Sequence, residues 1–381
     1  QYWLAGGGGH ADHGGGGCVV SGGVVTMMLA RARDTVVPNI RRNRGAGSSH
    51  GHTRIIRKAY FEHPDYIPLL HRSYELWAEL EGEAKISLFD QCGFLTCGLP
   101  DSESIKGLEA SYAAHGVMHE RLSYSEVRDR FPQFLIDSRA VGVLDSFGGY
   151  LRVEDCVKQH ILQAEAAGAE LFFQEPVVSW EVCNGGVVVG TASREVTARS
   201  LVLTTGAWAA PELTELGIPT EVWRKVLFWY ETDGAEQFLP DRFPTFYVET
   251  DSGHFYGFPS VDDKGLKVAE HFAKTPIDNP GVLDRNLLPD DEPPVRHFVR
   301  QTFPGVIGGR TEHVVCMYTI TPDQHFVVAC HPVHPQVVIG GGFSGHGYKF
   351  APVIGEVLGD LAVKGGTVWP VDFLGIRRFV N

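Results

Sequence analysis

A cysteine and a glycine-rich turn late in the chain have the order expected of a cofactor site. Cys316 lies in the apolar segment 314–319, where a thiol is usually a small core residue. A second apolar segment follows, and then a turn in which six of the eight residues 340–347 are glycine or serine. A thiol placed before such a turn predicts a covalent bond to a bound cofactor.

The glycine-rich turn is expected to open a helix. Glycines at the end of a buried strand present N–H groups and the positive end of a helix to an electron-rich ligand. We expect the strand at 337–339 and the helix at 350–362, with Lys349 just inside it. A tight turn with a surface lysine is the alternative, but the density of small residues favours a ligand. The Gly-Lys-Ser/Thr sequence of a Walker A loop is absent.

An arginine pair follows the small residues 47–53. Arg54 and Arg57 are separated by two isoleucines and, in a helix, would share one face. Arginine is mostly exposed, so ion pairs with acidic surface groups are one interpretation. The other interpretation places one guanidinium over a cofactor ring and the second on a substrate carboxylate.

A lysine and a histidine form a third candidate group, after Tyr256. In a strand, Lys267, Ala269 and His271 point to one face. A strand edge that faces water explains this pattern equally well, so the pattern is weak evidence when taken alone.

Other chemistries lack support in the sequence. The Gly-x-Ser-x-Gly turn of a serine nucleophile is absent. His50 and His52 come nearest to a metal-ligand pair, but they have no partners at ligand spacing. We therefore predict neither a serine hydrolase nor a metal site.

The composition predicts a globular protein of the cytoplasm. The 381 residues suffice for two domains, and 43% are hydrophobic. The net charge of −13 argues against nucleic acid or an anionic membrane as a partner, although local cations could bind a small anion. No apolar run has the length of a membrane span, and no signal-peptide core is evident. Seven cysteines without zinc-type spacing favour a reducing compartment.

Two patterns of elements predict two domains of an α/β (α+β) protein. Helix-then-strand units indicate a mainly parallel sheet, and they are expected at 65–81, 153–167, 169–173 and 200–205. Short aromatic-rich strands indicate an antiparallel sheet, and they are expected at 225–231, 246–249, 254–258 and 265–269. Residues 1–47 are too rich in glycine for ordinary secondary structure. A flexible leader, an irregular phosphate loop and an imperfectly recorded sequence remain open interpretations of that stretch.

The four candidate groups, at 47–57, 256–271, 316–318 and 340–349, together make the chain resemble the monomeric sarcosine oxidase family, which includes N-methyltryptophan and sarcosine/pipecolate oxidases. Three segments are the most specific. They are Ser49-His50-Gly51-His52-Thr53-Arg54-Ile55-Ile56-Arg57, Cys316-Met317-Tyr318-Thr319 and Gly342-Phe343-Ser344-Gly345-His346-Gly347-Tyr348-Lys349-Phe350. The resemblance implies a Rossmann-like FAD-binding domain of the glutathione-reductase type and an antiparallel-sheet substrate domain. The first is expected at 1–85, 146–220 and 315–381, and the second at 86–145 and 221–314.

The resemblance also implies FAD, attached covalently through Cys316. Arg54 would lie against the flavin ring with His50 beside it. The remaining cofactor contacts are expected from Ser49, Thr53, Gly206, Gly342, Gly345, Gly347 and Lys349.

Further roles follow for the substrate side. Arg57 and Lys349 would grip the substrate carboxylate. Lys267 would hold a water at the flavin and help to activate O2, because a cation favours the negative charge that develops on O2. Tyr256, His271 and Tyr318 would line the pocket. Lys267, Arg54, His271 and Tyr256 are thus the expected catalytic residues.

The implied reaction is oxidation of a secondary amino acid, with sarcosine first, by O2 in a monomeric enzyme. Sarcosine would yield glycine, formaldehyde and H2O2. L-pipecolate and N-methyltryptophan are alternative substrates, and a non-catalytic flavin-binding protein is a more remote alternative. A nicotinamide dehydrogenase is disfavoured by the poor glycine loop.

The chain departs from the family pattern near its N-terminus. Counting back from His50 places the nucleotide-binding loop at 15–20, where Gly15 and Gly17 fit and the third glycine is missing. The acidic residue expected to bind the ribose falls on Pro38. Gly15 and Gly17 nevertheless remain the expected ADP contacts.

Overall fold

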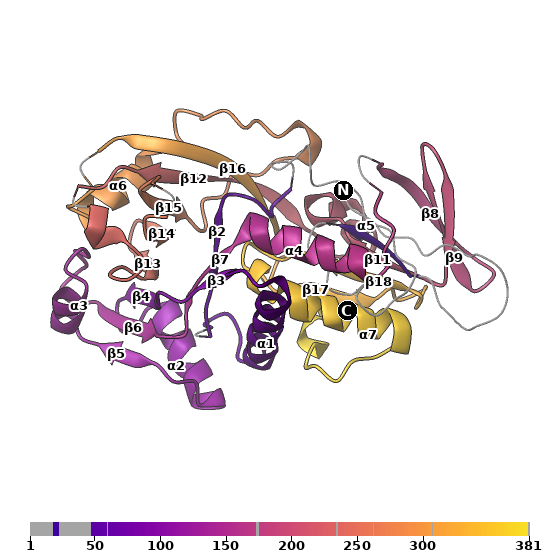
Figure 1. Cartoon of the computed structure of the whole chain (residues 1–381), viewed down its shortest axis with the longest axis horizontal. Helices are drawn as coiled ribbons and strands as arrows, with labels where there is room; N and C mark the ends of the chain where they lie inside the picture. Colours follow the sequence, from indigo (N-terminus) through magenta and orange to yellow (C-terminus); the bar gives the residue numbers. More distant parts are fainter. Residues whose placement is uncertain are drawn as a thin grey trace.

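The computed structural model shows two groups of sheets that lie side by side along the long axis of the molecule (Figure 1). The structure describes residues 18–22, 47–58, 60–172, 175–233, 235–261, 263–306 and 308–379. Within these ranges, none of the helices has the length and apolar character needed to cross a membrane.

One group is built on a four-stranded sheet. Its order is β1 (Cys18–Gly22), β11 (Ser200–Thr204), β18 (Val337–Gly341) and β17 (Val327–Cys330). The first three strands run parallel, and β17 is antiparallel to β18. This arrangement agrees with the mainly parallel sheet expected from the helix-then-strand units.

The strand expected at 169–173 does not form. Residues 169 and 171 make single bridges only, and residue 173 lies outside the described part of the chain. Glu170, between the two bridges, is exposed. Strand formation depends on backbone hydrogen bonds to a neighbouring strand more than on local propensity. The apolar residues of the segment 169–173 were therefore not sufficient.

Helices cover this sheet and provide its core. They are α1 (Tyr66–Ala84), α4 (Val153–Ala166), α5 (Ala210–Glu215) and α7 (Ala351–Lys364). Leu69 of α1, Val357 of α7 and Val338 of β18 belong to one buried cluster. The expected helices at 65–81, 153–167 and 350–362 therefore exist. A small sheet of β8 (Val177–Cys183), β9 (Gly186–Thr191) and β10 (Glu195–Ala198) projects at one end (Figure 1).

The second group is built on an eight-stranded sheet. Its order is β16 (Arg310–Ile320), β12 (Glu221–Tyr230), β15 (Leu266–Glu270), β14 (Gly253–Phe258), β13 (Thr245–Thr250), β4 (Phe94–Gly98), β6 (Val141–Asp145) and β5 (Glu120–Leu122). All neighbours are antiparallel except β13 and β4. The four aromatic-rich strands expected from the sequence are β12 to β15.

Three further helices belong to this group: α2 (Glu103–His115), α3 (Tyr124–Arg130) and α6 (Pro293–Thr302). Phe298 of α6 stacks on Phe255 of β14, with ring centroids 4.1 Å apart. The helix thereby seals one face of the sheet, and the opposite face is free to form part of a pocket. Short 3-10 turns lie at Gly206–Ala209, Ala235–Phe238, Pro280–Val282, Tyr348–Phe350, Asp372–Leu374 and Ile376–Phe379.

A three-stranded sheet joins the two groups. It consists of β2 (Thr53–Ile56), β7 (Gly149–Arg152) and β3 (Phe89–Asp90). The arginine segment is therefore an extended strand and not a helix, because Thr53–Ile56 pairs with β7 along its whole length. The expected domain boundaries stay a prediction, and the one between 314 and 315 falls inside β16.

Candidate functional site

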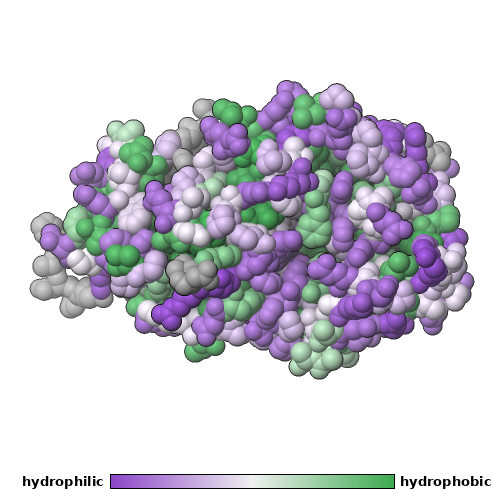
Figure 2. Space-filling view, turned by 180° about the vertical axis from the view of Figure 1, so that it is seen from behind, coloured by the Kyte–Doolittle hydropathy of each residue, from purple (hydrophilic) through white to green (hydrophobic). Residues whose placement is uncertain are grey.

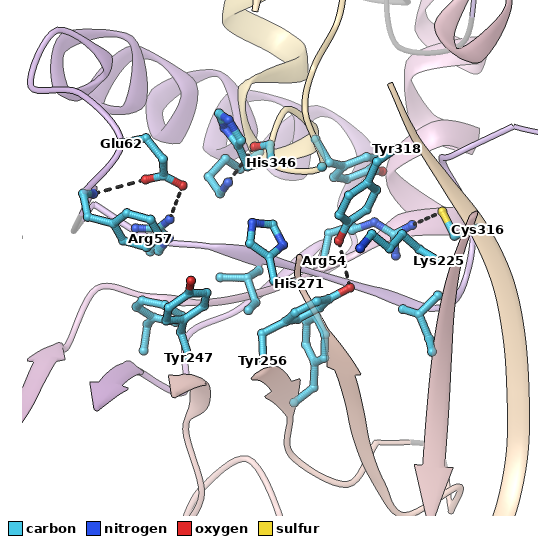
Figure 3. A pocket seen from close by; sticks show the side chains of 18 residues that line it. Arg54, Arg57, Glu62, Lys225, Tyr247, Tyr256, His271, Cys316, Tyr318 and His346 are labelled. Atoms are coloured by element: carbon cyan, nitrogen blue, oxygen red, sulfur yellow. Dashed lines mark hydrogen bonds and ion pairs between the residues drawn. The ribbon is translucent and has the colours of Figure 1, made fainter. Parts of the chain in front are cut away.

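A pocket lies where the two groups of sheets meet, and Figure 3 shows the side chains that line it. It encloses about 700 Å³ that protein atoms do not fill, part of it open to solvent. β2, β12, β14, β16 and the turn before α7 all contribute to its wall. The polar lining consists of Arg54, Arg57, Glu62, Lys225, Tyr247, Tyr256, His271, Cys316, Tyr318, His346, Tyr348 and Lys349.

The Cys316 thiol faces an arginine. Sγ of Cys316 lies 3.7 Å from Nη2 of Arg54, and the same nitrogen donates to the carbonyl of Ser48 at 2.7 Å. The thiol is 2% exposed, so it reacts only with a group inside the pocket. Cysteine sulfur is a nucleophile that can form a covalent bond to an electrophilic carbon.

His50 lies behind this pair with an unsatisfied nitrogen. Its Nε2 is buried and has no hydrogen-bond partner among the described residues. Burial, with Arg54 next, lowers the pKa of His50 to about 4, so the ring is neutral at pH 7. A buried polar atom without a partner costs about 1–3 kcal/mol, which a ligand in the pocket would recover.

Lys267 is buried near Arg54 and is held by the backbone of the arginine segment. Its ammonium donates to the carbonyls of Gly51 and Thr53 at 2.6 and 3.1 Å, and to Oγ1 of Thr53 at 3.0 Å. Burial, with Arg54 next, holds the pKa of Lys267 well below its ordinary value. Thr53, expected to contact the cofactor, thus orients this lysine, and Ser49 lies in the loop that precedes it.

Arg57 and Lys349 form a second cationic group at the other end of the pocket. Nη2 of Arg57 donates to Oε1 of Glu62 at 2.7 Å, and Nζ of Lys349 donates to the carbonyl of His346 at 2.7 Å. Burial, with Arg57 next, lowers the pKa of Lys349 to about 7. A carboxylate between the two side chains would meet a fork of N–H donors and an ammonium group.

Three aromatic side chains connect the two cationic groups. The hydroxyls of Tyr256 and Tyr318 lie 3.1 Å apart, and His271 packs edge-on against both rings. Burial, with Lys225 next, holds the pKa of His271 well below its ordinary value. The expected lining of Tyr256, His271 and Tyr318 is therefore brought together in one wall.

The glycine-rich turn packs directly on this wall. Gly342 and Gly345 have φ of 59° and 81°, a region that favours glycine. A Cβ on Gly345 would meet the Tyr318 ring at 2.3 Å, and one on Gly347 would meet Phe343 at 2.6 Å. Only a side-chain-free turn allows the backbone to come this close to the pocket.

Some residues expected in the site lie elsewhere in the fold, and others lie outside the described residues. Lys349 belongs to the 3-10 turn Tyr348–Phe350 before α7 and not to the helix itself. Gly15 and Gly17 lie outside the described residues. Residues 18–20, expected in the glycine loop, are the first residues of β1, which precedes any loop at that edge. Gly206 has φ of 61° and begins the turn after β11.

Several residues that line the pocket were not expected from the sequence. Lys225 is the cross-strand partner of Cys316, since β12 pairs with β16 in that register. Glu62 faces Arg57 from the loop before α1, and Tyr247 and His346 complete the wall. A charged residue in the apolar strand at 225–231 was the only available signal for Lys225.

The residues present fit a bound FAD. The pocket and the residues around it combine an orphaned nitrogen on His50, a buried thiol beside a guanidinium, and a glycine-rich turn before a helix. Positive groups suit the electron-rich end of a flavin ring, whose negative charge increases on reduction.

Comparisons with known proteins agree with this arrangement. The chain matches a family model described as FAD dependent oxidoreductase over residues 15–361. It is 40% identical over 337 residues to a monomeric sarcosine oxidase of Streptomyces avermitilis, which covers 87% of this chain and 88% of the relative. A human peroxisomal sarcosine oxidase is 36% identical over 356 residues, with 87% and 86% covered. An N-methyl-L-tryptophan oxidase of Citrobacter koseri is 33% identical over 339 residues, with 88% and 89% covered.

Solved structures share the fold. NikD, described as an unusual amino acid oxidase essential for nikkomycin biosynthesis, superposes with a TM-score of 0.79 at 22% identity, covering 93% of this chain and 95% of that chain. L-proline dehydrogenase from P. horikoshii gives a TM-score of 0.79 at 22% identity, with 94% and 96% covered. Pocket, family model and relatives lead to one conclusion: this chain belongs to the sarcosine oxidase family of FAD-dependent oxidoreductases, flavoenzymes that oxidise amines at a CH–NH group.

Proposed function

We propose that this protein oxidises sarcosine, taking up O2 and water and producing glycine, formaldehyde and H2O2. The observation that carries the proposal is the pairing, in one pocket, of a carboxylate clamp at Arg57 and Lys349 with a thiol–guanidinium pair at Cys316 and Arg54. FAD, when bound, supplies the redox chemistry by accepting two electrons from the amine and passing them to O2. The family relatives named for sarcosine support the choice of substrate.

Arg57 and Lys349 bind the substrate through its carboxylate. In the free protein, Glu62 occupies one edge of the Arg57 guanidinium, so a substrate carboxylate has to replace or share that contact. The Arg57 guanidinium also packs against the rings of Tyr60 and Phe61, at 4.4 and 4.6 Å from their centroids. These contacts fix the plane of the guanidinium group, so less conformational entropy is lost when the substrate carboxylate binds.

Arg54 and Lys267 supply positive charge at the end of the pocket near Cys316. Arg54, which is half-buried, contacts Cys316, and Lys267 is buried nearby; both have carbonyl oxygens as their main partners. Fixed positive charge in such a site stabilises negative charge that develops during reduction of O2. The neutral rings of His271 and Tyr256 favour the uncharged amine, which is the form that can be oxidised.

A peroxide-coupled assay of the flavin-loaded protein tests the proposal. The substrates are sarcosine, N-methyl-L-tryptophan, L-pipecolate and L-proline. We expect the highest kcat/KM for sarcosine. A protein that contains flavin but produces no peroxide from any of the four would overturn the oxidase assignment, and a clear preference for another substrate would reassign it.

We also propose that Sγ of Cys316 forms the covalent bond to the flavin 8α carbon. Its support is the buried thiol beside Arg54. In Cys316→Ser, acid precipitation should release the flavin into the supernatant, whereas the wild-type pellet should stay yellow. Cys330→Ser, at a partly buried thiol of β17, is the control and should retain its flavin. Flavin that remains attached in Cys316→Ser places the bond elsewhere.

Free thiols are found at Cys92, Cys97, Cys156, Cys183, Cys316 and Cys330, which supports a reducing compartment such as the cytoplasm. We propose that location, with a monomer as the working form.

A further inference from the structure

Lys225 is a buried cation that the proposed reaction leaves unused. It belongs to β12, is 3% exposed and lines the pocket. Its ammonium donates to one carbonyl, that of Ala273. Among the described residues it makes no ion pair, and burial lowers its pKa to about 7, with Glu270 opposing that shift. A buried ammonium has three donors and a large desolvation cost, so its unfilled donors attract an anion.

The other cations of the pocket are already accounted for. Arg54 contacts the thiol and the Ser48 carbonyl, while Arg57 and Lys349 form the carboxylate clamp. Glu62 is the single carboxylate in the pocket lining, and it pairs with Arg57. Sarcosine brings one carboxylate and no side chain, so it leaves Lys225 without an anionic partner in the pocket.

Lys225 stands apart from the clamp. Figure 3 shows Arg57 at one end of the pocket, His271 in the middle and Lys225 at the end with Cys316. Nζ of Lys225 lies 5.3 Å from the centroid of the Tyr318 ring, and Tyr318 packs against His271. Both Lys225 and Arg57 depress the pKa of His271, which places the histidine within reach of both charges.

We infer that Lys225 is a specificity residue for a second carboxylate, so that the pocket accepts N-methyl amino acids with an acidic side chain. The α-carboxylate binds Arg57 and Lys349, and the side-chain carboxylate reaches across His271 to the Lys225 ammonium. This inference rests on the proposed function, because it uses the same clamp and the same oxidation at the N-methyl group.

A binding experiment tests the inference without turnover. The probes are succinate and glutarate, each compared with its monoamide, in calorimetric titrations of the flavin-loaded protein at pH 6.5. We expect at least one diacid to bind about tenfold or more tightly than its monoamide, as charged hydrogen bonds predict. Lys225→Met should remove this difference, and Lys225→Arg should keep part of it.

Lys274→Met provides the matched control. Lys274 directly follows Ala273, whose carbonyl accepts from Lys225, but its side chain is exposed and pairs with Glu221 outside the pocket. This variant should keep the preference for the diacid. Equal binding of diacid and monoamide by the wild type would overturn the inference even if Lys225→Met does not fold. A preference that survives in Lys225→Met would also overturn it.

Turnover separates the two proposals. The peroxide assay compares N-methyl-L-aspartate and N-methyl-L-glutamate with N-methyl-L-asparagine and N-methyl-L-glutamine. Peroxide from sarcosine without any preference for the acidic member of a pair overturns the role of Lys225 and leaves the oxidase function intact. Peroxide from an acidic substrate, lowered about tenfold or more by Lys225→Met while sarcosine is affected less than about threefold, supports the inference. Diacid binding without peroxide from any substrate refutes the oxidase function alone.

Discussion

At the scale of single residues, the pocket contains more positive charge than its own carboxylates neutralise. Arg54 and Lys225 in the pocket lining, and Lys267 outside it, have carbonyl oxygens or a thiol as partners, and Glu62 pairs with Arg57. Removing a cation from water costs free energy unless an anion pairs with it in the protein. The charge pattern therefore describes a site built for an anionic substrate and an electron-accepting cofactor.

Lys267 gives a prediction about the reaction with O2. Lys267→Met removes a cation near the thiol–guanidinium pair. We expect the rate at which O2 reoxidises the reduced flavin to fall about 10²-fold or more. Anaerobic reduction by sarcosine should change far less. Stopped-flow absorbance measures both rates. Lys264→Met, at a half-exposed lysine paired with Glu312, should alter neither. Equal slowing of both reactions would reject the role in O2 activation.

Lys349 gives a prediction about pH. Its pKa is lowered to about 7 by burial and then by Arg57, so above that pH a growing fraction of the side chain is neutral. A carboxylate binds the charged form, and the dissociation constant of acetate should therefore rise with pH above about 7, up to tenfold per pH unit. Calorimetry from pH 6 to 9 measures it. Lys349→Met should bind weakly and show little pH dependence. A constant affinity in the wild type would contradict the assignment.

At the scale of elements, the turn between β18 and α7 sets the shape of the pocket. Gly345 combines φ of 81° with a close approach to the ring of Tyr318, whose hydroxyl pairs with Tyr256. Residues with a Cβ pay about 1–2 kcal/mol in this backbone region, and the ring would also have to move.

Gly345→Ala should therefore lower both the stability and the catalytic efficiency. We expect a lower thermal midpoint and at least about a tenfold loss in kcat/KM for the preferred substrate, because the Tyr318 ring is displaced. Gly366→Ala is the matched control, since a Cβ there meets no atom within 4 Å. A Gly345→Ala variant with unchanged kinetics would show that the turn tolerates a side chain.

At the scale of the whole molecule, the surface favours a monomer. The most exposed large apolar residues, among them Val178, Val282 and Val368, belong to different segments of the chain. On the face shown in Figure 2, hydrophobic residues form small groups among hydrophilic ones. Scattered apolar residues of this kind are normal for monomers, and the net charge of −13 adds repulsion between copies.

Sedimentation equilibrium of the full chain should accordingly give a mass near 41.8 kDa. The mass should stay constant when the protein concentration or the salt concentration is raised. A mass close to twice this value would contradict the monomer. It would indicate that two copies associate despite the repulsion between their negative charges.

The sequence by itself determined the local features of this protein. Helical periodicity located α1, α4 and α7, aromatic alternation located β12 to β15, and the motifs at 49–57, 316–319 and 342–350 identified the family. Such features depend on contacts between near neighbours in the chain, or on residue types that few other roles explain. Residues 169–173 show the limit of this approach, because a strand also needs partners that local sequence does not reveal.

Only the tertiary structure decided which distant residues meet. The register of β12 against β16 places Lys225 beside Cys316, the loop before α1 brings Glu62 to Arg57, and the carbonyls of β2 orient Lys267. Each of these contacts joins segments far apart in sequence, and a shift of one residue in a strand would turn its side chains to the opposite face. The thiol, the arginines and the glycine turn could be recognised from their order in the chain. The charge balance of the pocket, in contrast, follows from how distant strands and loops pack together.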